Sequence, residues 1–123
     1  MSHRFVWVDI PVRDLDRAIA FYSALLGVQV TREAGPGFSF GLLPHEDGEV
    51  GGCLVLPEGE DAPSTRGPLV YLNVEGRLDA ALEAAAARGG QVLQPPHPLG
   101  PFGFRALLLD SEGNRVAVHS MAR

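Results

Sequence analysis

The sequence predicts an α+β fold built from two similar βαβββ units. An alternating apolar strand is followed by a helical pattern twice along the chain, and the two helical patterns end at Gly27 and Gly89. Matching positions in the two halves are separated by the same number of residues throughout. With 123 residues, the chain has the length of one domain. We therefore expect residues 1–123 to fold as a single domain.

The first unit begins with FVWVDIPV at 5–12, an alternating stretch rich in β-branched and aromatic residues that predicts a strand. Asp14 is a good N-cap for the helix that follows, and Gly27 stands where a left-handed C-cap is expected. Helical spacing is kept by Leu15, Ala18, Ile19, Tyr22, Leu25 and Leu26. Three short strands are expected after the helix: VQV at 28–30, FSFGLL at 38–43 and GGCLVL at 51–56.

The stretch PEGEDAPSTRGP, 57–68, is dense in proline, glycine and charge, which indicates a surface linker. It separates a first unit at about 4–56 from a second unit at about 69–121. In the second unit LVYLNV at 69–74 predicts a strand, and a helical stripe follows at Leu78, Ala81, Leu82 and Ala85. Three further strands are expected from QVL at 91–93, GFRALLL at 103–109 and RVAVHSM at 115–121.

The two units match at a constant offset of 62 residues. This offset superposes Val12 on Val74, Gly27 on Gly89, Gly51 on Gly113, Leu54 on Val116 and Leu56 on Val118. Agreement at two helix ends, one turn and two strands predicts an internal duplication.

Composition excludes several classes of function. The net charge is -5 and there is no basic stripe, so we expect no nucleic-acid partner. All ten cationic residues are arginine, which excludes a Schiff-base lysine and the lysine of a P-loop. Cys53 is the single cysteine, and no apolar run approaches the roughly 20 residues of a membrane span. We expect a cytoplasmic protein with no membrane partner.

Three motifs, in this order, resemble the vicinal oxygen chelate superfamily of glyoxalase, bleomycin resistance and extradiol dioxygenase proteins. They are VDIPVRDLDRAIAFYSALLG at 8–27, LVYLNV leading into ALEAAAARGG, and LLLDSEGNRVAVHS at 107–120. The resemblance implies that each unit curls its sheet into half of a cup, with the helices outside. It also implies a symmetric homodimer, because relatives commonly complete or flank their cups in this way.

The alternation of side chains then sorts the strand residues by face. Residues expected to pack on the helices are Val6, Val8, Ile10, Val70, Leu72, Val116 and Val118. Residues expected to face the cup are Phe5, Trp7, Asp9, Leu69, Tyr71, Asn73, Arg115, Ala117 and His119.

Metal-dependent members of the superfamily usually place one His or Glu ligand on the first and the last strand of each unit. The corresponding positions here are Trp7, Val55, Leu69 and Ala117. None of these side chains can donate to a divalent metal, so we expect no metal and no other cofactor. The alternative is a shifted metal site made by Asp9, Tyr71 and His119.

Two functional hypotheses remain. In the first, the cup binds a small, partly apolar or aromatic molecule, and the ligand-binding residues are Trp7, Phe40, Cys53, Tyr71, Phe102 and Arg115. In the second, the protein is a lyase, an isomerase or a dioxygenase-like enzyme that uses Asp9 and His119 as acid and base. For each of these two residues the competing interpretation is a polar group satisfied by its neighbours or by water. For Cys53 the default interpretation is a small buried hydrophobe, because nothing nearby in the sequence would lower the pKa of its thiol.

Several loops and aromatics keep alternative interpretations. Trp7, Phe38, Phe40, Tyr71, Phe102 and Phe104 can line a pocket or simply fill the core. The segment QPPHPLGPFGF, 94–104, suits a lid over the cup or a plain connection, and His45 and His97 fall in loop contexts. DSEGN is predicted to be a structural turn, in which Asp110 and Asn114 bond local backbone and Gly113 adopts a positive φ.

Overall fold

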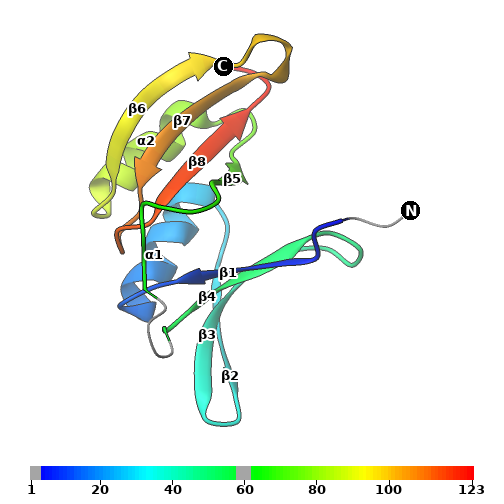
Figure 1. The fold of residues 1–123 in the computed structure, drawn as a ribbon, viewed down its shortest axis with the longest axis vertical. Coiled ribbons are helices and arrows are strands. Elements are labelled where there is room, and N and C mark those ends of the chain that lie inside the picture. Colours follow the sequence, from blue (N-terminus) through cyan, green and yellow to red (C-terminus); the bar gives the residue numbers. More distant parts are fainter. Residues whose placement is uncertain (1–3, 58–61) are drawn as a thin grey trace.

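The computed structural model describes residues 4–57 and 62–123, which form two four-stranded mixed sheets and two α-helices (Figure 1). The first sheet has the order β1-β4-β3-β2, with β1 Trp7–Pro11, β2 Thr31–Gly35, β3 Phe38–Leu43 and β4 Gly51–Val55. The second has the order β5-β8-β7-β6, with β5 Val70–Asn73, β6 Gln91–Pro98, β7 Phe104–Leu109 and β8 Arg115–Ser120. In each sheet the first strand pairs in parallel with the last, which confirms two βαβββ units. Four residues of the predicted linker, 58–61, lie outside the described residues.

The two helices begin and end near the predicted positions. α1, Leu15–Leu26, is capped by Asp14, whose side chain accepts a hydrogen bond from the Arg17 amide at 3.0 Å. It ends at Gly27, whose φ of 66° is in the left-handed region that glycine adopts without a Cβ clash. α2, Leu78–Ala87, is followed by Gly89 with a φ of 91°. No helix in the described ranges is long and apolar enough to cross a membrane.

The two units share one hydrophobic core. α1 packs on β3 and β4, α2 packs on β6 and β8, and the helices pack against each other, as Figure 1 shows. Leu54 of β4 and Val118 of β8 are both fully buried in this common cluster. The face of each sheet that points away from the helices, here called its cup face, therefore lies outside the core. Trp7 and Tyr71 on these faces remain 43% and 46% exposed.

Three local predictions were wrong. The segment 28–30 does not pair as a strand, because the amides of Val28 and Val30 donate to Ser23 and close the end of α1. Val6 does not pack on the helices but is 74% exposed, since it precedes β1. The segment 94–104 is only partly a loop, because β6 continues to Pro98. β6 is an edge strand with irregular register, the setting in which prolines are tolerated.

The internal repeat holds, but its offset changes along the chain. Pro11 pairs with Val55 in the first sheet, and Asn73, which is 62 residues after Pro11, pairs with His119. His119 is thus the counterpart of Val55 at an offset of 64 residues, and Leu54 corresponds to Val118 instead of Val116. The connections on either side of β7 differ in length from those beside β3, which explains the change.

Candidate functional site

The cup face of the first sheet carries a hydrogen-bonded group around Asp9. The Asp9 carboxylate accepts hydrogen bonds from the indole Nε1 of Trp7 at 3.0 Å and from the Cys53 thiol at 3.3 Å. Burial raises the pKa of Cys53, and its hydrogen bond to Asp9 acts in the same direction. The thiol is therefore a protonated donor and not a nucleophilic thiolate.

A cavity of about 710 Å³ opens beside this group. It is lined by Asp9, Pro11, Gly37, Phe38, Ser39, Val55, Leu56, Pro57 and Ala62. The ring of Phe38 stacks on that of Phe40, with centroids 5.8 Å apart, so an aromatic pair stands next to the cavity. The volume is in the range of small-molecule sites, and the mixture of apolar walls with one carboxylate is typical of them.

The cup face of the second sheet carries a polar row, to which each strand contributes one residue. Strand register places Asn73, His119, Arg105 and His97 next to one another in that order. The Arg105 guanidinium donates from Nε to His97 Nε2 at 2.9 Å and from Nη1 to the hydroxyl of Tyr71 at 2.5 Å. It also lies 5.9 Å from the centroid of the Tyr71 ring.

His119 is bound to the short 3-10 helix η1, Gly100–Phe102. Its Nε2 lies 2.6 Å from the carbonyl oxygen of Phe102. Since a carbonyl can only accept, this nitrogen carries the proton and donates it. Asp9 and His119 lie on different sheets, and no hydrogen bond joins them within the described part of the chain.

The structure separates the predicted ligand-binding residues into two groups. Trp7, Phe40 and Cys53 lie on the cup face of the first sheet. Tyr71, Arg115 and Phe102 belong to the second unit, where Phe102 is 70% exposed in η1. Among the other aromatics, Phe104 packs against the core instead of a pocket.

Arg105 and His97 were missed as site residues. His97 was assigned to a loop, whereas it lies on β6 opposite Arg105. The signal that would have found Arg105 is the alternation in FRALLL, in which Ala106 and Leu108 are fully buried. Arg105 must then point to the other face of the sheet, as Leu107 does.

The resemblance implied metal ligands at Trp7, Val55, Leu69 and Ala117, and none of these side chains has a donor for a divalent cation. Strand pairing makes His119, and not Ala117, the counterpart of Val55, so this position in the second unit carries one imidazole. Within the two described ranges, no three His, Cys, Asp or Glu residues come together in a way that could hold a metal ion.

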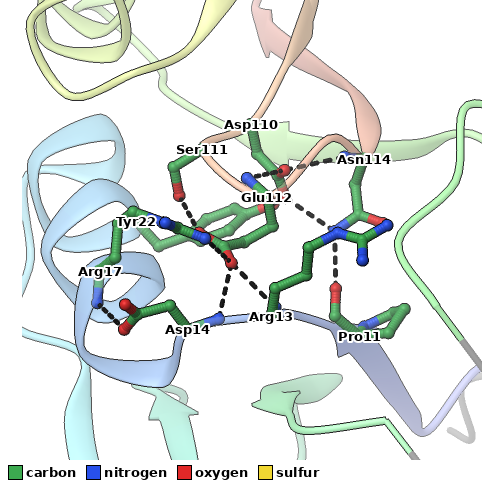
Figure 2. Close-up of polar contacts among 9 residues, drawn as sticks. All are labelled: Pro11, Arg13, Asp14, Arg17, Tyr22, Asp110, Ser111, Glu112 and Asn114. Atoms are coloured by element: carbon green, nitrogen blue, oxygen red, sulfur yellow. Dashed lines mark hydrogen bonds and ion pairs between the residues drawn. The ribbon is translucent and has the colours of Figure 1, made fainter.

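Next to the site, the β7–β8 turn reaches the start of α1 (Figure 2). Glu112 accepts hydrogen bonds at 2.8 Å from the backbone amides of Arg13 and Asp14, and it pairs with the Arg17 guanidinium at 2.7 Å. Burial alone would raise the pKa of Glu112, but the bonds from Arg17, the Asp14 amide, Ser111 and the Arg13 amide outweigh it. The pKa is lowered to about 2. The carboxylate is thus an acceptor that joins the two units.

Asp110 forms the second half of this network. Its carboxylate accepts hydrogen bonds from the Tyr22 hydroxyl at 2.5 Å and from the Asn114 amide at 2.8 Å. Asn114 also donates to the carbonyl of Pro11, and Gly113 has a φ of 96°. Burial, followed by the charge of Asp110, raises the pKa of Tyr22 well above its ordinary value. The predicted structural turn is confirmed, and it also links the units.

The family model for the Glyoxalase/Bleomycin resistance protein/Dioxygenase superfamily matches residues 4–118, and the chain belongs to this family. It is 34% identical over 110 residues to proteins from Mycobacterium bovis and Mycobacterium tuberculosis that are named putative glyoxylase CFP32. That match covers 88% of this chain and 40% of those proteins, so the chain spans about two fifths of their length.

Solved structures confirm the fold. A glyoxalase/bleomycin resistance protein from Albidiferax ferrireducens has a TM-score of 0.76 at 24% identity, with 96% of this chain and 98% of that chain covered. A glyoxalase I mutant from Zea mays has a TM-score of 0.70 at 21% identity, covering 94% of this chain and 45% of that chain. At 24% and 21% identity, the similarity to these structures establishes the fold and carries no information about the chemistry of the site.

Proposed function

We propose that this chain binds a small, partly aromatic molecule on its cup faces without a metal ion. The observation that supports this most is the cavity of about 710 Å³ on the first sheet, beside the stacked rings of Phe38 and Phe40. Stacking on an aromatic ring favours a flat, apolar ligand, and Asp9 supplies a polar contact that orients it. Trp7, Val55 and Leu69 offer no metal donor, and His119, the counterpart of Val55, offers only one, which supports binding over Lewis-acid chemistry.

Catalysis by Asp9 and His119 has less support than binding. A general base needs a free acceptor within reach of its substrate, and an acid–base pair acts together only when its members meet. Asp9 and His119 lie on different sheets, and no hydrogen bond joins them among the described residues. Asp9 Oδ1 accepts from Trp7 and Cys53, and His119 Nε2 donates to the carbonyl of Phe102, so each side chain is bound within its own unit and the two do not act as a pair.

A symmetric homodimer is part of the proposal. Both cup faces are open in a single chain, and the exposed apolar residues Phe5 and Val6 precede β1, an edge strand of its sheet. Tyr71 lies on β5, the edge strand that corresponds to β1 in the second sheet. A second copy would cover this apolar surface. Sedimentation equilibrium at micromolar concentration should return twice the chain mass, and a monomer mass would overturn the dimer.

Binding is tested with the fluorescence of Trp7, which is the sole tryptophan and lies on a cup face. A panel of aromatic antibiotics and small keto acids is screened by thermal melting. A ligand at 100 times its Kd adds about 2.7 kcal/mol of stability. A true ligand should also change the emission of Trp7. The proposal is overturned if no compound changes either signal.

A pair of variants locates the ligand. Phe38→Ala removes a ring that lines the cavity, whereas Leu93→Ala removes an exposed apolar side chain of β6 on the other sheet. Affinity should fall roughly tenfold or more in the first variant and stay unchanged in the second. Equal effects of the two substitutions would place the ligand elsewhere.

A further inference from the structure

The cup face of the second sheet contains cationic side chains and no acidic one. Alternation and register assign to this face Tyr71, Asn73, Gln91, Gln94, His97, Arg105, Leu107, Leu109, Arg115, Ala117 and His119. The carboxylate that follows β5, Glu75, accepts hydrogen bonds from the backbone amides of Met121 and Ala122. A chain with a net charge of -5 thus keeps one face free of negative side chains.

Arg105 lies on β7, an inner strand, near one end of this face, and it has no carboxylate partner in the described ranges. A guanidinium has five N–H donors, of which one binds His97 and one binds Tyr71. Neither partner carries a negative charge that would neutralise the cation. The remaining donors can form a two-point hydrogen bond with a planar carboxylate, the geometry for which arginine is best suited.

His97 and Tyr71 hold the guanidinium in place from two sides. Because an arginine can only donate, His97 Nε2 must accept, and the proton therefore sits on Nδ1. That nitrogen lies 2.9 Å from the carbonyl oxygen of Pro95, which accepts the proton's hydrogen bond. His97 is thus a neutral imidazole with a defined tautomer. The Arg105 guanidinium is therefore positioned by His97, which the carbonyl of Pro95 orients, and by the hydroxyl of Tyr71.

Aromatic and apolar surface lies beside the cation. Tyr71 is 46% exposed, and its ring packs near the guanidinium. Leu107 lies next to Arg105 on the same face of β7, and η1 presents Phe102, whose carbonyl is bound by His119. A ligand with its charge on Arg105 can therefore lay an apolar ring on its neighbours.

Arg115 is a second cation on this face, at the opposite end of the strands from Arg105, since it pairs with Leu109. Its Nη2 donates to the carbonyl of Gly67 at 3.2 Å, so the linker occupies this guanidinium and leaves Arg105 as the arginine of the face that a ligand can approach.

We propose that Arg105 binds the carboxylate of an aromatic carboxylic acid on the second sheet, with Tyr71 and His97 as positioning residues. This rests on the proposed function, the binding of small, partly aromatic molecules on the cup faces, and it names a ligand class for the second face. The site at Arg105 is separate from the cavity beside Phe38, because no residue of the second sheet lines that cavity.

The test compares naphthalene-2-carboxylate with naphthalene-2-carboxamide, which has nearly the same shape and no charge. Isothermal titration calorimetry measures both affinities for the wild-type protein, Arg105→Gln and Arg88→Gln. Arg88 is exposed at the end of α2, so its substitution removes the same charge away from the face. We expect the wild type and Arg88→Gln to prefer the carboxylate by roughly ten- to a hundredfold, as for a lost charge-assisted bond. Arg105→Gln should bind the two compounds equally.

A second variant covers the case in which Arg105→Gln melts far below the wild type. Tyr71→Phe keeps the ring and removes only the hydroxyl that positions Nη1, so the preference for the carboxylate should fall roughly threefold. The affinity for the carboxamide should stay the same, which a general loss of structure would not allow.

The other outcomes separate this inference from the proposed function. Equal affinities in the wild type would overturn the anion site and leave small-molecule binding intact. Displacement of the carboxylate by inorganic phosphate would overturn the aromatic assignment, because a site for any anion would then be present. If neither naphthalene compound binds while the screen finds other ligands, the inference fails alone. If the screen also finds none, the proposed function fails with it.

Discussion

Glu112 and Arg17 form a 2.7 Å ion pair although 95 residues separate them in the sequence. The same carboxylate accepts the amides of Arg13 and Asp14 at the start of α1. A helix N-terminus carries a partial positive charge, so an anion beside it is stabilised. Asp14 caps α1, and the second unit supplies a further anion that binds the amides of Asp14 and of Arg13 before it. The contact therefore stabilises the junction of the units as well as the helix.

Replacement of Glu112 by glutamine should destabilise the protein by about 2 to 3 kcal/mol. The side chain of Glu112 is fully buried, and a glutamine cannot accept at both oxygen positions where the carboxylate binds Arg17 and the amides of Arg13 and Asp14. The free energy of unfolding in urea measures the effect. Glu83→Gln, an exposed change of the same kind on α2, should stay within about 0.5 kcal/mol of the wild type. Equal stabilities of the two variants would show that the ion pair contributes nothing.

Acid should remove the stabilisation that the ionised Glu112 gives to the folded protein. The pKa of Glu112 in the folded protein, about 2, lies below its ordinary value of 4.5, so the unfolded chain binds more protons between these values. The stabilisation is complete above about pH 5 and is lost as the pH falls from about 4.5 to about 2, to a total of roughly 3 kcal/mol. The difference in unfolding free energy between wild type and Glu112→Gln should therefore shrink over this interval.

Glu75 also loses stabilising bonds in acid. The backbone amides of Met121 and Ala122 lower its pKa, so its contribution decreases in the same direction. It is present in both proteins, and it cancels in their difference. A difference that stays constant down to about pH 2 would contradict the assignment to Glu112.

Gly103, which follows η1, should tolerate alanine poorly. Its φ is 89°, and a Cβ there would lie 2.6 Å from the carbonyl oxygen of Ser120. Gly37 has a similar φ of 79°, but a Cβ there would meet no heavy atom of the described residues within 4 Å. Both alanine variants lose roughly 1 to 3 kcal/mol to backbone strain, since φ is positive at each position. Gly103→Ala should lose a further 1 to 3 kcal/mol, approximately, to the collision with Ser120. Matching melting temperatures would mean that the loop moves away without cost.

Substitution of His119 by alanine should affect ligand binding more than stability. The ring is only partly buried on the cup face, and the carbonyl of Phe102 that it binds belongs to an exposed residue that water can reach. We expect a loss of about 0.5 to 1 kcal/mol in unfolding free energy and a clear decrease in affinity for a ligand of the second cup face, such as naphthalene-2-carboxylate. A loss of several kcal/mol with unchanged affinity would make His119 a structural residue.

Elemental analysis of the purified protein should find less than one transition-metal ion per chain. The reason is that Trp7, Val55 and Leu69 offer no donor, and the single imidazole of His119, which corresponds to Val55, falls short of the three or four donors that a transition metal needs. One tightly held metal ion per chain that is lost in both Asp9→Ala and His119→Ala would instead establish the shifted site. Such a site would require Asp9 and His119 to approach each other across two sheets.

The sequence was sufficient for features that depend on local backbone geometry. Strand alternation correctly placed Val116 and Val118 in the core, and helix periodicity with its end signals located α1 between Asp14 and Gly27. These patterns repeat every two or every 3.6 residues, so each stretch carries its own evidence. The order of the motifs also predicted the family, which the family model confirmed.

Only the tertiary structure decided which side chains meet. The pairing of Glu112 with the start of α1, and the grouping of Arg105 with His97 and Tyr71, depend on strand register and on how the two units pack. The change of offset from 62 to 64 shows how strongly the grouping of side chains depends on loop length. A difference of two residues determines whether His119 or Ala117 lies opposite Asn73. No local pattern encodes a contact between residues 95 apart, because its free energy arises only when both units have folded and their polar groups are taken out of water together.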